Sequence, residues 1–224
     1  MMVKEINKAN KLKVIAIGAH PDDFEIGAGM RLMHHVKNGD EVIGIICSDG
    51  EQGGDGEIRL KEAEYAAKFV GIKELYKLHF PDTRFPNYLT IKDRLEKIIK
   101  KENPSIAYIH FKEDQHQDHR VVSLASSIAC RKVLTILNYK SPSTINALFN
   151  PHLFHIGLKK DFQKKMELLK IYKSQIERNG VLDLRHAEIE AKYHASSIHF
   201  PENHYAEPFC ANHIILNKMV GYDD

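Results

Sequence analysis

The sequence of 224 residues contains no tryptophan and only three cysteines, Cys47, Cys130 and Cys210. These cysteines are odd in number, lie far apart and form no CxxC pair, which argues against a disulfide framework and against a thiolate zinc site. A long apolar run near the amino terminus is also absent. The apolar stretch VIAIGA ends at His20. That stretch is far too short for a transmembrane helix. We therefore expect a cytoplasmic protein with no membrane span.

An excess of charge of either sign is missing as well. The chain has 32 Lys and Arg against 30 Asp and Glu, so its formal net charge is only +2. Without a basic excess we expect neither nucleic acid nor an anionic membrane as a partner, and a small-molecule substrate instead. The sequence leaves the oligomeric state open, a homo-oligomer included. Histidine, by contrast, is abundant with 14 copies, and it is the commonest metal ligand and a proton carrier near neutral pH.

Short apolar runs alternate with helical patterns along most of the chain. Strands are expected at 12–17, 41–47, 74–79 and 105–111, and helices at 25–38, 58–70, 89–101 and 121–137. This order predicts an α/β fold, a Rossmann-like three-layer sandwich with a mostly parallel sheet, in one domain over residues 1–224. Residues 158–177 are expected to be helical, and the last forty or so residues to form an irregular C-terminal extension.

The first predicted strand is followed by the segment AHPDDFE at 19–25. Asp22 or Asp23 could cap the next helix, since a carboxylate accepts hydrogen bonds from the free N–H groups of a first turn. Capping explains neither His20 nor the second aspartate, because adjacent carboxylates repel each other unless a cation or a proton separates them. A divalent metal ion resolves that conflict.

The loop after the strand at 105–111 contains a second polar segment, DQHQDH at 114–119. Two histidines three residues apart are by themselves weak evidence for a site, because such pairs recur by chance. This loop, however, follows another parallel strand, so we expect it at the same edge of the sheet as His20 and Asp23. Two histidines and one carboxylate with an open fourth position form the usual site of a hydrolytic zinc ion. Such an ion lowers the pKa of water to roughly 7.

AHPDD followed by Gly-Ala-Gly, and then HQDH at 116–119, resembles the LmbE/PIG-L family of zinc-dependent N-acetylglucosaminyl deacetylases. The resemblance extends to CSDGEQGG at 47–54 and, more weakly, to YKSQ at 172–175 and YAEPF at 205–209. It implies an LmbE-like fold and a hydrolase that removes the acetyl group from an N-acetylated amino sugar, free or as a glycoside or conjugate. The implied cofactor is zinc, which another divalent metal could replace.

The resemblance also implies how the metal site works. His20, Asp23 and His119 would bind zinc. Asp22 would be the general base, which takes a proton from the metal-bound water and returns it to the leaving amine.

Four further residues receive roles from the same resemblance. Zinc and His116 would stabilise the tetrahedral oxyanion, and Asp118 would orient His116 or hold its imidazolium. Arg59 and Asp82 resemble residues that contact the sugar.

Three other hypotheses remain open. The glycines at 27 and 29 suggest a Rossmann-type nucleotide-binding module, but the third glycine of GxGxxG is missing and AHPDD puts negative charge where a phosphate would lie. A metal-binding scaffold without chemistry is disfavoured, because Asp22 and His116 are not needed as ligands and yet both are present. Within the hydrolases, the alternative is a metal-dependent amidohydrolase that acts on a different N-acyl substrate.

Overall fold

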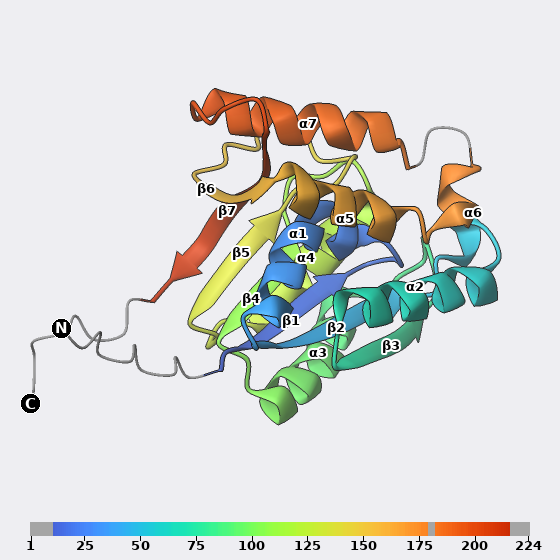
Figure 1. Cartoon of the computed structure of the whole chain (residues 1–224). Coiled ribbons are helices and arrows are strands. Elements are labelled where there is room, and N and C mark those ends of the chain that lie inside the picture. Colours follow the sequence, from blue (N-terminus) through green and yellow to red (C-terminus); the bar gives the residue numbers. More distant parts are fainter. Residues whose placement is uncertain (1–10, 179–181, 216–224) are drawn as a thin grey trace, which may run out of the picture.

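A mixed sheet of seven strands organises the computed structural model, which describes residues 11–178 and 182–215 (Figure 1). The strand order is β3-β2-β1-β4-β5-β7-β6. The strands are β1 (Lys13–Gly18), β2 (Glu41–Ser48), β3 (Glu74–Phe80), β4 (Ile106–His110), β5 (Thr135–Tyr139), β6 (Leu153–Leu158) and β7 (His204–Ile214). β1 to β5 pair in parallel, whereas β7 is antiparallel to both of its neighbours, β5 and β6.

Helices cover both faces of the sheet, as Figure 1 shows. The helices are α1 (Asp23–Lys37), α2 (Gly56–Val70), α3 (Tyr88–Glu102), α4 (Gln117–Ala129), α5 (Lys159–Leu169), α6 (Lys173–Ile176) and α7 (Leu184–Ser197), with a short 3-10 turn, η1, at Glu51–Gly53. α1, α2 and α5 pack on one face, α3 and α4 on the other, and α7 packs against β7. None of these described helices is both long enough and apolar enough to pass through a bilayer.

The central strand β1 explains why the sheet is buried on both sides. Val14 and Ala16 point into the apolar cluster beneath α1, while Ile15 and Ile17 point into the cluster beneath α4. All four side chains are fully buried. A strand between two helical layers needs apolar residues at every position, which is why it appears in the sequence as an unbroken hydrophobic run.

The predicted α/β sandwich is confirmed, but three of the predicted elements are wrong. The helix expected at 158–177 is divided into α5 and α6 by a turn at 170–172. The helix expected at 121–137 ends at Ala129, and the last part of that range belongs to β5, which begins at Thr135. A buried strand and a buried helix segment are alike in hydrophobicity over so few residues. The part of the chain expected to be an irregular C-terminal extension contains α7 and β7 as far as residue 215, and residues 216–224 lie outside the described residues. β7 pairs only with strands that are distant in sequence, so no local pattern marks it.

The glycines of α1 are packing residues. A Cβ atom on Gly27 would lie 2.3 Å from Cδ2 of Tyr139, and one on Gly29 would lie 3.2 Å from Cδ2 of Leu168. The Gly-Ala-Gly sequence therefore lets α1 approach β5 and α5 closely, which accounts for these glycines without a nucleotide.

Candidate active site

The carboxyl ends of the parallel strands bring His20, Asp23 and His119 together, although α4 follows α1 by almost a hundred residues. His20 lies in the turn after β1, Asp23 in the first turn of α1, and His119 in the first turn of α4. Nδ1 of His20 is 3.7 Å from Oδ2 of Asp23, and Nε2 of His119 is 3.3 Å from Oδ1 of Asp23. Two donors on a tetrahedral zinc ion lie about 3.4 Å apart, so this set of donors fits such an ion.

A carboxylate holds the other ring nitrogen of each histidine. Nε2 of His20 is 3.0 Å from Oδ1 of Asp82 and 3.2 Å from Oδ2 of Asp118, and Nδ1 of His119 is 3.3 Å from Oδ2 of Asp114. Metal-binding histidines characteristically have such a carboxylate partner, which orients the ring and selects its tautomer. The two nitrogens left over are the ones that face Asp23.

The charges around these donors favour a cation. Although burial lowers the pKa of both histidines, the neighbouring carboxylates raise it to about 9 for His20 and to about 10 for His119. Burial raises the pKa of Asp23, but His119 and His110 hold it well below its usual range. The donor set therefore attracts positive charge, which a divalent metal supplies by displacing protons from the imidazoles.

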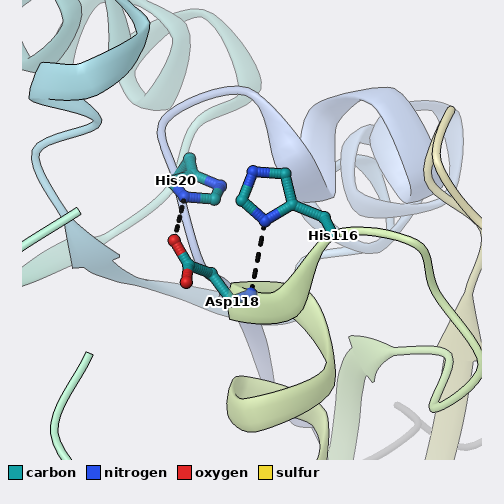
Figure 2. A group of neighbouring side chains, drawn as sticks. All are labelled: His20, His116 and Asp118. Carbon is teal, nitrogen blue, oxygen red and sulfur yellow. Dashed lines mark hydrogen bonds and ion pairs between the residues drawn. The ribbon is translucent and has the colours of Figure 1, made fainter. Parts of the chain in front are cut away.

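Figure 2 shows an overlapping group, His20, His116 and Asp118, whose potential donor atoms also lie close together. Here the Asp118 carboxylate is engaged by the ring of His20 and by the backbone N–H of Thr83, at 3.2 and 2.9 Å. The resemblance places that carboxylate beside His116, whereas the structure places it on His20. His116 instead accepts a hydrogen bond at Nδ1 from the Asp118 backbone N–H, at 3.3 Å. Of the two groups, His20, Asp23 and His119 match a metal site better.

His116 lines the cavity in front of the donors. Burial, with the charges of His119 and His20, lowers its pKa. A neutral imidazole that accepts at Nδ1 carries its proton on Nε2, so His116 can offer that N–H to a ligand.

Asp22 adopts the left-handed backbone conformation with φ = 99°, which is rare for a residue other than glycine. It occupies the N-cap position of α1, yet its side chain makes no capping hydrogen bond. Its carboxylate lies 3.5 Å from Nη2 of Arg59. Burial raises the pKa of Asp22 to about 7, although Arg59 opposes the shift. A carboxyl group with this pKa is matched to general base catalysis near neutral pH.

Arg59 and Asp82 both line the cavity and both hold the loops around it. Arg59 donates to the carbonyl oxygens of Gly50 and Pro21, at 2.8 and 3.0 Å. Asp82 uses one oxygen for His20 and accepts the backbone N–H of Gln52 at the other, at 2.9 Å. The cavity itself measures about 300 Å³, which is at the small end for a ligand site.

Two buried residues of this centre receive no role from the sequence. Nε2 of His110 is 3.1 Å from Oδ2 of Asp23, and its ring stacks on His119 with 4.1 Å between the centroids. Burial and the charge of His119 lower the pKa of His110 to about 4. Asp114 accepts hydrogen bonds from the hydroxyls of Ser141 and Ser143, at 2.5 and 2.6 Å, besides facing His119. Asp114 lies in the polar segment 114–119, which is the signal that could have revealed it. No such signal distinguishes His110 from other buried residues of β4.

These observations define the class of protein. The fold is a Rossmann-like α/β sandwich, and the carboxyl edge of its sheet holds a histidine and aspartate donor set for a metal, with a second, perturbed aspartate beside it. This combination is typical of a hydrolytic metal site.

Comparison with known proteins identifies the family. The family model "PIG-L: GlcNAc-PI de-N-acetylase" matches residues 15–130. The chain is 38% identical over 179 residues to the uncharacterized deacetylase YaiS of Escherichia coli (strain K12), which covers 75% of this chain and 95% of YaiS. It is 32% identical over 120 residues to the diacetylchitobiose deacetylase of Thermococcus kodakarensis, covering 48% of this chain and 45% of that protein. The chain belongs to the PIG-L/LmbE family of deacetylases, which are hydrolases.

A solved structure agrees with the fold. The N,N'-diacetylchitobiose deacetylase of Pyrococcus horikoshii, in complex with its inhibitor MPG, superposes with a TM-score of 0.76 at 22% identity. The match covers 90% of this chain and 84% of that one. At this level of identity the likeness concerns the α/β architecture.

Proposed function

We propose that this protein is a zinc-dependent hydrolase that removes the acetyl group from an N-acetylated amino sugar of the N-acetylglucosamine type, free or as a glycoside or conjugate. The observation that carries the proposal is the position of Asp22, a buried carboxyl with a pKa of about 7, directly beside the donor set of His20, Asp23 and His119. Membership of the PIG-L/LmbE family and the two relatives named as deacetylases support the acetyl group as the one removed.

The donor set favours zinc as the metal. His20, Asp23 and His119 would hold the ion through two imidazole nitrogens and one carboxylate oxygen, a combination common in hydrolytic zinc sites. When bound, a divalent metal supplies Lewis-acid polarisation of a carbonyl group and acidifies water. All three cysteines are buried, and none belongs to the donor set, which leaves imidazole and carboxylate as the ligand types.

The chain's own groups then divide the remaining work. Asp22 accepts a proton from the attacking water and delivers it to the amine nitrogen as the C–N bond breaks, so that acetate and a free amino sugar leave. His116 donates its Nε2–H to the acetamide oxygen, on which negative charge develops. Arg59 keeps the Asp22 carboxylate in place and, with Asp82, faces the sugar across the cavity.

Asp118 acts through another residue. Its carboxylate holds the ring of His20, so we assign it the task of orienting that ligand. We therefore expect replacement of the Asp118 side chain to slow the reaction by weakening metal binding. The backbone N–H of Asp118 separately orients His116.

The test is an acetate-release screen over N-acetylglucosamine, its neutral glycosides and small chito-oligosaccharides, each with and without a chelator. We expect release from at least one of them and loss of that release with the chelator. His119→Ala should lower both the bound metal and the release, whereas His186→Ala, which changes an exposed histidine of α7, should lower neither. Release of a different acid from an N-acyl substrate, with none from any acetylated sugar, would replace this proposal by the broader amidohydrolase.

A further inference from the structure

The loop between β3 and α3 contributes Asp82 and Thr83 to the wall of the active-site cavity. Thr83 has φ = 60°, which lies in the left-handed region of backbone conformation. A β-branched residue is a genuine outlier there, because its Cβ crowds the backbone. Such outliers persist only where the surrounding structure holds them, and they are concentrated at functional sites.

The first turn of α4 supplies the contacts that hold Thr83. Its backbone N–H donates to Oδ2 of Asp118 at 2.9 Å, and its carbonyl oxygen accepts a hydrogen bond from Nε2 of Gln117 at 2.7 Å. The same Oδ2 atom of Asp118 lies 3.2 Å from Nε2 of His20 (Figure 2). Thr83 is therefore fixed one carboxylate oxygen away from the ring of a proposed metal ligand. Gln117, which the chemistry at the metal does not use, gains a role as the second of these contacts.

The hydroxyl of Thr83 is available to a ligand. Both hydrogen bonds to α4 use the backbone of Thr83, and its hydroxyl makes none with the residues that the structure describes. Thr83 is exposed and lines the cavity. The neighbouring Asp82 is more committed, because its Oδ1 faces His20 at 3.0 Å and its Oδ2 accepts the backbone N–H of Gln52 at 2.9 Å.

The surroundings of this hydroxyl favour a neutral, hydroxylated ligand. A threonine hydroxyl donates one hydrogen bond and accepts others, as a sugar hydroxyl does, so the two groups can bond in either direction. The carboxylates of Asp82 and Asp118 adjoin Thr83, one as its neighbour in sequence and one through its N–H. An anionic group on this side of the cavity is therefore disfavoured.

We propose that Thr83 is a specificity-determining residue, whose hydroxyl hydrogen-bonds to a hydroxyl group of the amino sugar, and that Gln117 is the residue that positions it. The inference rests on the proposed function and deepens it, because it makes a hydroxyl of the sugar, besides the acetamide, a group that the protein recognises. Thr83 exchanges no proton with the reacting amide, so its effect is on substrate binding.

The test is a double-mutant cycle between residue 83 and the hydroxyls of the substrate. T83V keeps the shape of threonine and loses the hydroxyl, whereas T83S keeps the hydroxyl. The substrates are the methyl glycoside of N-acetylglucosamine and its 3-deoxy, 4-deoxy and 6-deoxy analogues. We expect T83V, but not T83S, to lower kcat/KM for the parent glycoside by about threefold to tenfold, mostly through KM, which is the range for one hydrogen bond between neutral groups. For one deoxy analogue the loss should vanish, because the partner hydroxyl is already missing.

A second measurement tests the backbone conformation without turnover. T83G and T83A both lack the hydroxyl, but only glycine adopts φ = 60° without crowding. T83G should therefore have a Tm about 2–4 °C above that of T83A. At Thr90, an exposed threonine of α3, the order should be reversed, because glycine is the poorer residue inside a helix. A T83G protein no more stable than T83A would show that residue 83 is not held in the left-handed conformation, and would overturn the inference.

Further variants test Gln117 and the specificity of the effect. Q117A should lower kcat/KM for the parent glycoside by less than tenfold and should add little to T83V in the double variant, since both changes remove the same contact with the sugar. T90V is the matched control and should keep the wild-type kcat/KM for all four substrates. No loss in T83V, or an equal loss for all four substrates, would overturn the inference while leaving the deacetylase intact. Absence of acetate from all four with the wild-type protein, and from every other acetylated sugar, would refute the proposed function instead.

Discussion

Asp114 offers the sharpest test of how the proposed metal ligands are oriented. Its Oδ2 lies 3.3 Å from Nδ1 of His119, and the pKa of Asp114 is held well below its usual range, against the effect of burial, by His119 and by Ser141. The carboxylate therefore stays ionised and fixes His119 with Nε2 toward Asp23. Asp114→Asn keeps the size of the side chain and removes its charge.

We expect Asp114→Asn to weaken zinc binding by tenfold to a hundredfold, which corresponds to about 1.4–2.7 kcal/mol. The assay is a competition titration against a chromogenic chelator of known affinity. Asp114 also accepts hydrogen bonds from the hydroxyls of Ser141, Ser143 and Thr144, which can rotate to suit a new partner. A loss of about 1 kcal/mol of stability there would lower Tm by about 2–4 °C, so the titration should be run well below the transition.

Two control variants separate the effect on the metal from general destabilisation. Asp93→Asn removes an exposed carboxylate of α3 and should leave zinc affinity unchanged. Ser143→Ala removes one donor to Asp114 and keeps its charge, so its effect should be less than tenfold. Wild-type affinity in a folded Asp114→Asn protein would refute the reasoning that this carboxylate orients a metal ligand.

Three further perturbations have defined outcomes. Asp22→Asn should lower kcat for acetate release by about 10²–10⁴-fold and keep the bound metal, as measured by metal analysis of the same sample. Gly27→Ala should cost about 1–3 kcal/mol in thermal or urea unfolding, because the added methyl meets the ring of Tyr139, whereas Gly29→Ala, which meets only a flexible leucine, should cost less. Burial lowers the pKa of His155 to about 4, so on acidification the unfolded chain takes up a proton before the folded protein does, and stability is lost between about pH 6.5 and 4. His155→Gln should make the free energy of unfolding less dependent on pH in that range.

The central sheet could be predicted because its signals are local. The runs that became β1 and β2 are short, β-branched and followed by helical periodicity, which identifies a parallel α/β sheet without knowledge of the pairing. Neither β6 nor β7 could be found in this way, since their only partners are each other and β5. The end of α4 was predicted wrongly for a similar reason, because the pairing of β5 with β4 decides where β5 begins.

The site could be predicted from the sequence where residue type and sheet topology point to the same residues. His20, Asp23 and His119 follow two parallel strands, and the shared edge of the sheet explains why they meet. The partners of these residues depend on side-chain direction, which no spacing rule supplies. Asp118 and Asp82 are both far from His20 in sequence, yet the carboxylates of both contact Nε2 of His20. His110, likewise, could not be distinguished from an ordinary buried strand residue.

The central claim is that the donor set of His20, Asp23 and His119 binds the one metal ion on which hydrolysis depends. Its most direct test is to strip the protein with a chelator and add zinc back in steps, recording bound metal per chain and acetate released from an N-acetylated amino sugar at each step. We predict that release rises in proportion to bound zinc and levels off at about one ion per chain, and that His119→Ala neither binds the ion nor recovers activity. Release at the full rate by metal-free protein, or full recovery of His119→Ala at the same stoichiometry, would contradict it.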